Sequence, residues 1–242
     1  MKPTPYYDQD GITIYHGDCA KILPFIDPVD LLLTDPPYGI GESSKKNASR
    51  GVLASPRDYG EYNWDQTTID FDLLNGLISK AGISIIFGGN YYPLPPSSCW
   101  LIWDKENGAN DFADGEMAWT NMRRAMRIKR HLWNGMIRVG HEARHHPTQK
   151  PLAVMTWCIE QAGDGIATIL DPFMGSGTTL VAAKNQGKRC IGIEREESYC
   201  KIAVDRLGQQ PLFQTEEPSG PAGLDAPGNN LISFLEPESI DR

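Results

Sequence analysis

The sequence predicts an α/β fold with a mainly parallel sheet and helices on both of its faces. Six short apolar runs rich in β-branched residues are bounded by turn residues, which is typical of buried strands. Segments between several of them repeat apolar residues every three to four positions, which is typical of helices. With 242 residues, 40% of them hydrophobic and 22% charged, the composition is that of a globular protein. One large core is expected, because a chain of this length buries about 70% of its unfolded surface.

The expected elements alternate along the chain. The strands are expected at residues 12–18, 29–35, 82–88, 99–105, 167–171 and 189–194. The helices are expected at residues 69–78, 152–159, 178–186 and 196–207, the second of them beginning after Pro151. Strands that alternate with helices form parallel sheets covered on both faces.

Two stretches interrupt this alternation. Residues 39–60 are rich in Gly, Ser and basic residues and are too long for an ordinary connection, which predicts a mobile functional loop. From about residue 209 onward the chain carries five prolines and mostly acidic charges, so a disordered acidic tail over 209–242 is expected.

The sequence also argues against several classes of protein. No apolar run approaches the roughly 18 residues of a membrane span, and the N-terminus lacks the apolar stretch of a signal peptide, so we expect a cytoplasmic protein without a membrane partner. The five cysteines are scattered, with no CxxC pair, which indicates buried free thiols rather than disulfides or a zinc site.

Charge is distributed unevenly. The formal net charge is -8, yet residues 121–150 hold eight basic side chains and one acidic one, a local charge of +7. A segment this basic in an acidic protein is a candidate surface for a polyanion, although a run such as Arg123 to Arg130 is also compatible with a solvated helix face.

The segment DPFMGSGTT, residues 171–179, follows an expected strand and opens an expected helix, and the next strand ends at Glu194. This is the layout of a Rossmann-type nucleoside site, where glycines let the backbone approach the ligand and an acid binds the ribose hydroxyls. Leu180 stands where GxGxxG needs its third glycine, and no lysine follows Gly177, so a diphosphate ligand is disfavoured. A nucleoside with a carboxylate, such as S-adenosylmethionine, fits better. A helix cap without a ligand is the structural alternative.

The segment DPPY, residues 35–38, ends the strand at 29–35. Two prolines remove two N–H donors and stiffen the backbone, so carbonyls there can face outward as acceptors. Asp35 and the Pro36 carbonyl suit the two hydrogens of an exocyclic amino group, and Tyr38 suits stacking on a flipped base. A proline-rich turn that merely closes a strand is the alternative.

Residues 141–145, HEARH, match the HExxH zinc signature. The match lies between Gly140 and Pro147, which leaves too little room for the long helix of such sites. We therefore predict no metal site, and expect these histidines in a solvated loop that faces nucleic acid.

Taken together, DPPY (35–38), HPTQKP (146–151) and DPFMGSGTT (171–179), in this order, resemble the amino-group DNA methyltransferases of the permuted β class. The segments GD (17–18), IIFGGNYY (85–92), CWLIWDK (99–105) and EMAWT (116–120) support the resemblance, which covers roughly residues 10–208. It implies a Rossmann-like S-adenosylmethionine-dependent methyltransferase domain over residues 1–208. This domain would divide into a catalytic half (10–120), a target-recognition insert (about 121–145) and a cofactor half (146–208).

The resemblance also implies roles for individual residues. Catalysis is assigned to Asp35, Pro36, Pro37 and Tyr38. Asp18 would contact the adenine of S-adenosylmethionine, Glu194 its ribose, and Lys150 its carboxylate. The further cofactor contacts implied are His146, Thr148, Asp171, Phe173, Gly175, Ser176, Gly177 and Thr178. The expected DNA contacts are Lys45, Lys46, Arg50, Arg123, Arg124, Arg127, Lys129, Arg130 and Arg138.

The expected reaction is methyl transfer to N6 of adenine in DNA, since DPPY leans toward adenine within the family. N4 of cytosine is the chemical alternative, because both amino groups need the same acceptors. A DNA-binding module without catalysis, and a dinucleotide-dependent oxidoreductase, are the alternatives from other classes; the missing third glycine argues against the oxidoreductase. The short recognition insert suggests a homodimer or a short DNA target.

Overall fold

The structure is a computed structural model of the chain. It describes residues 2–39, 68–107, 113–134, 137–138 and 149–209, with only the backbone for residues 134, 137 and 138. All of these residues fall within one compact unit, residues 1–210. The expected loop at 39–60, the HExxH match and the expected tail lie outside the described residues, except at Gly39 and the first residue of the tail, Gln209.

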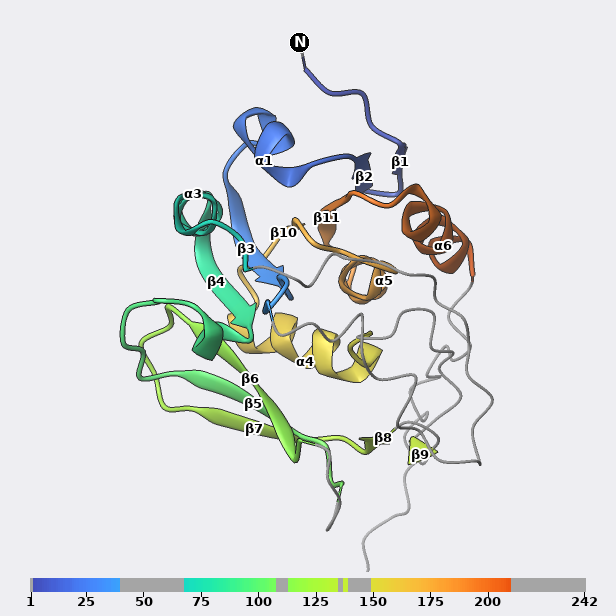
Figure 1. The fold of residues 1–242 in the computed structure, drawn as a ribbon. Helices are drawn as coiled ribbons and strands as arrows, with labels where there is room; N and C mark the ends of the chain where they lie inside the picture. The colour runs from blue at the N-terminus through green and yellow to red at the C-terminus, as the bar shows by residue number, and fades with distance from the viewer. Residues whose placement is uncertain (1, 40–67, 108–112, 135–136, 139–148, 210–242) are drawn as a thin grey trace, which may run out of the picture. The chain divides into compact units, whose positions relative to one another are not determined.

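The described strands form one large mixed sheet and a small hairpin (Figure 1). The order in the large sheet is β1-β2-β11-β10-β3-β4-β6-β5-β7. Its strands are β1 (Tyr7–Gln9), β2 (Ile12–His16), β3 (Val29–Thr34), β4 (Ala81–Phe87), β5 (Trp100–Asp104), β6 (Gly115–Thr120), β7 (Arg127–Arg130), β10 (Thr168–Asp171) and β11 (Arg189–Glu194). The hairpin pairs β8 (Trp133–Asn134) with β9 (Ile137–Arg138).

The predicted parallel sheet is confirmed for five neighbouring strands, β2, β11, β10, β3 and β4. Beyond β4 the sheet is mixed, because β6 pairs antiparallel with both β4 and β5, and β7 pairs parallel with β5. The order of the strands reverses between β10 and β3, since the chain runs outward from each of them in opposite directions. Open α/β sheets bind ligands at such a reversal, beyond the carboxyl ends of the strands.

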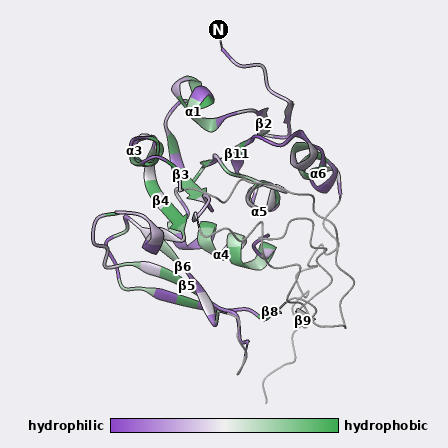
Figure 2. Ribbon diagram, viewed as in Figure 1, coloured by the Kyte–Doolittle hydropathy of each residue, from purple (hydrophilic) through white to green (hydrophobic). Residues whose placement is uncertain are grey.

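Helices cover both faces of the sheet (Figure 1). On one face, α4 (Leu152–Ala162), α5 (Thr178–Asn185) and α6 (Glu197–Gly208) bury one core. On the other, α1 (Cys19–Ile22), η1 (Leu23–Phe25) and α3 (Phe71–Ser79) bury a second. A further short helix, η2 (Gly89–Tyr91), follows β4. Strands buried on both faces are apolar along their length, and Figure 2 shows β3 and β4 among the most hydrophobic segments.

The predicted strands and helices are confirmed to within one or two residues at most ends, and all five cysteines are free and buried. The sequence interpretation missed the strands β1, β6 and β7, the β8–β9 hairpin and the short helices α1, η1 and η2. In particular, Arg127 to Arg130 form an edge strand rather than a helix face. A parallel neighbour, β5, accepts this strand, which outweighs the helix propensity of Arg and Lys. None of the described helices is long and apolar enough to cross a membrane.

Candidate active site

The carboxyl ends of the five parallel strands bring four acidic side chains to one edge of the sheet. Asp18 follows β2, Asp35 follows β3, Asp171 ends β10 and Glu194 ends β11. Asp35 and Asp171 therefore flank the point where the strand order reverses. Thr34 connects the two sides, since its hydroxyl donates to Asp171 at 3.0 Å.

Asp171 organises the glycine-rich turn between β10 and α5. It is 3% exposed and accepts hydrogen bonds from the Thr34 hydroxyl, from the Phe173 backbone N–H at 3.2 Å and from the Thr179 hydroxyl at 2.5 Å. Burial raises the pKa of this carboxyl to about 7 in spite of these three donors. Asp171 thus fixes both ends of the turn from within.

The turn itself needs glycine. Gly177 has φ +79°, and a Cβ there would lie 2.7 Å from the Cβ of Ala203 in α6, so a side chain is excluded. From α6, the guanidinium of Arg206 donates to the Ser176 carbonyl at 2.7 Å and to the Thr178 hydroxyl at 3.0 Å. Arg206, 8% exposed, is a structural support of the turn that the sequence interpretation missed.

Glu194 and Asp18 lie where the ends of β11 and β2 face the turn. The Glu194 carboxylate accepts from the backbone N–H of Gly175 at 3.0 Å and of Glu196 at 2.8 Å, so its position is fixed. Burial raises its pKa, and these backbone donors oppose that shift. Asp18 caps α1 by accepting from the Ala20 N–H at 2.9 Å.

Asp35 is held from two sides. One carboxylate oxygen accepts from the ammonium of Lys150 at 2.5 Å, and the other accepts from the hydroxyl of Tyr38. Burial raises the pKa of the Asp35 carboxyl, and the positive charge of Lys150 opposes this. The ammonium of Lys150, which the resemblance assigns to the cofactor carboxylate, pairs with carboxylates of the protein in this structure, and its contact with the cofactor stays a prediction.

Aromatic residues surround the DPPY segment. The rings of Tyr38 and Tyr91 stack with centroids 4.9 Å apart, and the hydroxyl of Tyr92 donates to the carbonyl of Pro37. Gly88, at φ +64°, makes room for Tyr38, because a Cβ there would lie 2.1 Å from the Tyr38 ring. The stack shows that this site can hold two flat rings face to face.

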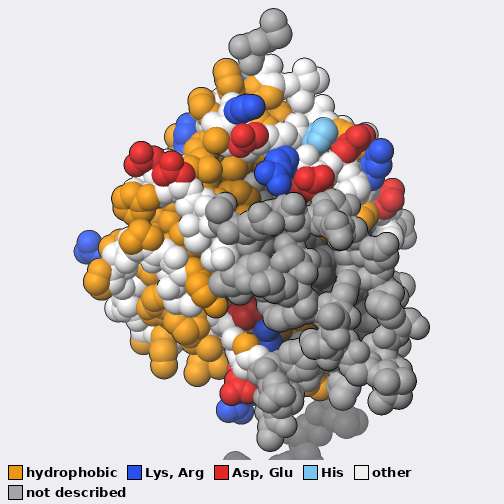
Figure 3. Space-filling view, viewed as in Figure 1, with side chains coloured by type: hydrophobic (Ala, Val, Ile, Leu, Met, Phe, Trp, Pro, Cys, Tyr) orange, Lys and Arg blue, Asp and Glu red, His pale blue; other side chains and the backbone are white. Residues whose placement is uncertain are grey.

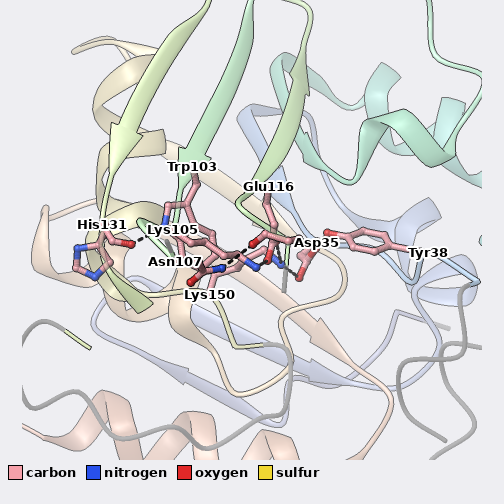
Figure 4. A network of polar contacts seen from close by, with 9 residues as sticks. Asp35, Tyr38, Trp103, Lys105, Asn107, Glu116, His131 and Lys150 are labelled. Atoms are coloured by element: carbon pink, nitrogen blue, oxygen red, sulfur yellow. Dashed lines mark hydrogen bonds and ion pairs between the residues drawn. The ribbon is translucent and has the colours of Figure 1, made fainter. Parts of the chain in front are cut away.

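A charged network extends from Asp35 toward β5 and β6 (Figure 4). The ammonium of Lys150 lies 2.9 Å from the carboxylate of Glu116, at the start of β6, and Glu116 in turn lies 2.6 Å from the ammonium of Lys105, which follows β5. Burial raises the pKa of Glu116, but the two ammonium groups outweigh it and hold the pKa at about 2. Burial disfavours the charge of Lys150, but the two carboxylates raise its pKa above the usual value.

One cavity of about 320 Å³ joins these parts. A cavity of this size holds a ligand as large as a nucleoside derivative. Its lining runs from the Asp18 and Glu194 end, past the glycine-rich turn, to the Asp35 end. The residues relevant to binding are Asp18, Asp35, Pro37, Lys150, Asp171, Phe173, Gly175, Ser176, Thr178 and Glu194.

Known proteins resemble the chain along most of its length. A family model for DNA methylases, of the N6 and N4 type, matches residues 95–205. The Type II methyltransferase M2.LlaDCHI of Lactococcus lactis subsp. cremoris is 26% identical over 263 aligned positions, which cover 86% of this chain and 94% of that protein. M2.DpnII of Streptococcus pneumoniae is 28% identical and covers 84% and 92%, respectively. The chain is therefore similar to amino-group DNA methyltransferases along most of its length, as its motifs indicate.

Solved structures show that the chain has the fold of S-adenosylmethionine-dependent DNA methyltransferases. A crystal structure of an M1.HpyAVI–SAM complex matches with a TM-score of 0.54 and 25% identity, covering 82% of this chain and all of that one. The N4-cytosine-specific PvuII DNA methyltransferase also matches with a TM-score of 0.54, at 15% identity, covering 87% and 91%. The Rossmann-like methyltransferase fold predicted from the motifs is therefore confirmed.

The described basic side chains of residues 121–150 do not all face outward. Arg127 and Arg130 are exposed on the edge strand β7, and Arg130 lies 3.4 Å from Asp104. Arg124 is turned inward, since its guanidinium donates to the carbonyl of Gln161, at the end of α4, at 2.5 Å. Arg124 thus stabilises the fold, and these contacts do not support its expected role at a phosphate.

Several of the predicted site residues lie outside the described part of the chain. These are His146 and Thr148 of the cofactor set and Lys45, Lys46 and Arg50 of the DNA set, while the side chain of Arg138 is not described. Among the described residues, no cluster of three or more His, Cys, Asp or Glu side chains could hold a metal ion.

Proposed function

We propose that the chain transfers a methyl group from S-adenosylmethionine to N6 of adenine in DNA. The observation that carries the proposal is the position of Asp35: a partly buried carboxylate at the reversal of strand order, beside aromatic rings, in the same cavity as Asp18, Glu194 and the glycine-rich turn. The order of the motifs, catalytic before cofactor, supports assignment to the permuted β class.

The residues at one end of the cavity fit S-adenosylmethionine. Glu194 is a fixed acceptor suited to two ribose hydroxyls, and Asp18 lies on the neighbouring strand end, where the adenine would bind. The turn at residues 171–177 offers backbone rather than a lysine, which suits a nucleoside without a diphosphate. S-adenosylmethionine supplies a sulfonium methyl carbon, which the lone pair of the base nitrogen attacks while the bonding electrons return to sulfur.

The residues at the other end suit the amino group of a flipped base. Its nitrogen is a weak nucleophile because its lone pair is delocalised into the ring, and it gains positive charge as the new bond forms. An Asp35 oxygen that accepts one amino hydrogen stabilises that charge in a buried site. The same oxygen can take the proton that the methylated nitrogen releases and pass it to water. Tyr38 and Tyr91 provide ring faces against which a base can stack.

The proposal is tested by identifying the methylated nucleoside. Purified protein is incubated with labelled S-adenosylmethionine and unmethylated DNA. The DNA is then digested to nucleosides, which are identified by mass spectrometry. N6-methyladenine is the expected product. N4-methylcytosine alone would replace the base but keep the mechanism, because Asp35 serves either amino group, whereas 5-methylcytosine or no product would overturn the proposal.

A further inference from the structure

Glu116 forms a second layer behind Asp35. Lys150, which precedes α4 and is 7% exposed, lies between the two carboxylates, 2.5 Å from Asp35 and 2.9 Å from Glu116. Antiparallel pairing brings the start of β6 beside the end of β5, so Lys105 reaches the other oxygen of Glu116 at 2.6 Å. Figure 4 shows these side chains converging: Glu116 lies in β6, and Asp35, Lys105 and Lys150 lie next to the ends of β3, β5 and α4.

The four groups carry two negative and two positive charges when all are ionised, so the cluster is neutral. Charges removed from water are tolerated when they are paired, and removing one partner leaves an uncompensated charge. A base that enters the site therefore contacts Asp35 as part of a cluster with no net charge. This balance depends on Glu116, since Asp35 alone cannot neutralise both ammonium groups.

We propose that Glu116 is a positioning residue for methyl transfer, acting through Lys150 to preserve the acceptor strength of Asp35. Lys150 fixes one oxygen of Asp35, and the Tyr38 hydroxyl occupies the other. When a base replaces the Tyr38 hydroxyl at Asp35, Lys150 must stay in place without neutralising the charge that makes Asp35 a strong acceptor. Glu116 allows this because it is a second partner for the Lys150 ammonium. The inference rests on the proposed role of Asp35.

A charge-compensation experiment separates this role from a packing role. Glu116→Gln keeps the shape but leaves the cluster with one excess positive charge. The single-turnover rate of methyl transfer is expected to fall about 10- to 100-fold, with affinity for S-adenosylmethionine within threefold of wild type. Lys105→Met added to Glu116→Gln restores neutrality, and this double variant is expected to recover at least about tenfold in rate.

The outcomes are distinct. If Glu116 only packs the strands together, removing Lys105 as well makes the site worse, so a double variant no faster than Glu116→Gln overturns the inference. A wild-type rate in Glu116→Gln overturns it too. If Glu116→Gln lacks a cooperative melting transition, Glu116→Asp is used instead. Its shorter side chain moves the carboxylate away from the ammonium of Lys150, which is expected to slow methyl transfer about 3- to 10-fold. An unchanged rate contradicts the inference. Failure of the proposed function itself would show separately, as wild-type protein that does not methylate DNA.

Discussion

At the scale of single residues, Asp35 is the group on which the proposed chemistry depends. Asp35→Ala removes the acceptor for the amino group but leaves Lys150 paired with Glu116, so the fold should persist. We expect methyl transfer to fall by at least about 10²- to 10³-fold. Affinity for S-adenosylmethionine, measured by calorimetry, should stay within severalfold of wild type. A variant with near-normal turnover would remove Asp35 from the mechanism.

Glu194 should show the opposite behaviour. Its carboxylate is held by two backbone N–H groups and faces the cavity, so a ligand with two hydroxyls meets a preorganised acceptor. Glu194→Ala is expected to weaken S-adenosylmethionine binding by about 1.5 to 3 kcal/mol, or about 10- to 150-fold. The methyl-transfer rate at saturating S-adenosylmethionine should change much less. Unchanged binding in calorimetric titration would refute the ribose assignment.

Asp171 predicts a dependence of stability on pH. Its pKa is about 7 in the folded protein against 3.8 for the free side chain, so folding favours the protonated form. The stability that this protonation contributes is complete below about pH 4 and is lost as the pH rises through about 7. Asp171→Asn cannot titrate. Between pH 5 and 8, the free energy of unfolding of wild type should therefore fall by about 3 kcal/mol relative to Asp171→Asn. If the difference in free energy of unfolding between wild type and Asp171→Asn is the same at pH 5 and pH 8, the shifted pKa is contradicted.

At the scale of elements, periodicity predicted the buried parts of the fold well. The strands β3, β4, β10 and β11 are apolar because both faces are covered, and the helices between them have one apolar face, so each pattern has a single interpretation. β6 and β7 were missed because neither pattern applies there. β7 is an exposed edge strand of four residues, RIKR, in which only the pairing with β5 determines the structure.

The candidate site divides in the same way. Asp35, Asp171 and Glu194 were predictable, because each ends an apolar strand at the edge where α/β sheets bind ligands. Glu116 and Arg206 were not, since their roles depend on side chains distant in the sequence, Lys150 and Ser176 respectively. The EMAWT segment, which contains Glu116, supported the family resemblance but gave no indication that Glu116 contacts Lys150.

The edge strand gives the prediction for DNA binding. Arg123, Arg127 and Arg130 are exposed and Lys129 is partly exposed, whereas Arg124 is bound to Gln161. Neutralising the first four together should lower the slope of log affinity against log salt by about 0.9 for each phosphate that the variant no longer neutralises. Arg124→Gln is the matched control, expected to lower the melting temperature but to leave the slope unchanged. If the quadruple variant has the wild-type slope, these four side chains do not contact phosphates and are only solvated.

At the scale of the whole molecule, the two cores and the cavity depend on each other. Asp171 ties β10 to β3 through Thr34, and Arg206 ties α6 to the glycine-rich turn, so the binding edge is supported from within the sheet and from the helix layer that contains α6. The side of the molecule formed by α3 and β4 to β7 carries many hydrophobic side chains (Figure 3). Met117 in β6, Met126 before β7 and Ile128 in β7 are exposed. The homodimer suggested by the short recognition insert stays a prediction, which sedimentation equilibrium can test.

The last prediction concerns the acidic segment after residue 210. The buried hydrophobic residues of the described chain end at Leu207, within the last turn of α6, and the segment is polar and rich in proline. Such a segment buries little apolar area, so its removal should change the free energy of unfolding by less than about 0.5 kcal/mol. For a domain of this size that is a shift of about 1 to 2 °C in melting temperature. A chain ending at Gln210 should therefore melt within this range of the full chain and methylate DNA at the same single-turnover rate. A larger loss of either would show that the segment packs on the domain or takes part in binding DNA.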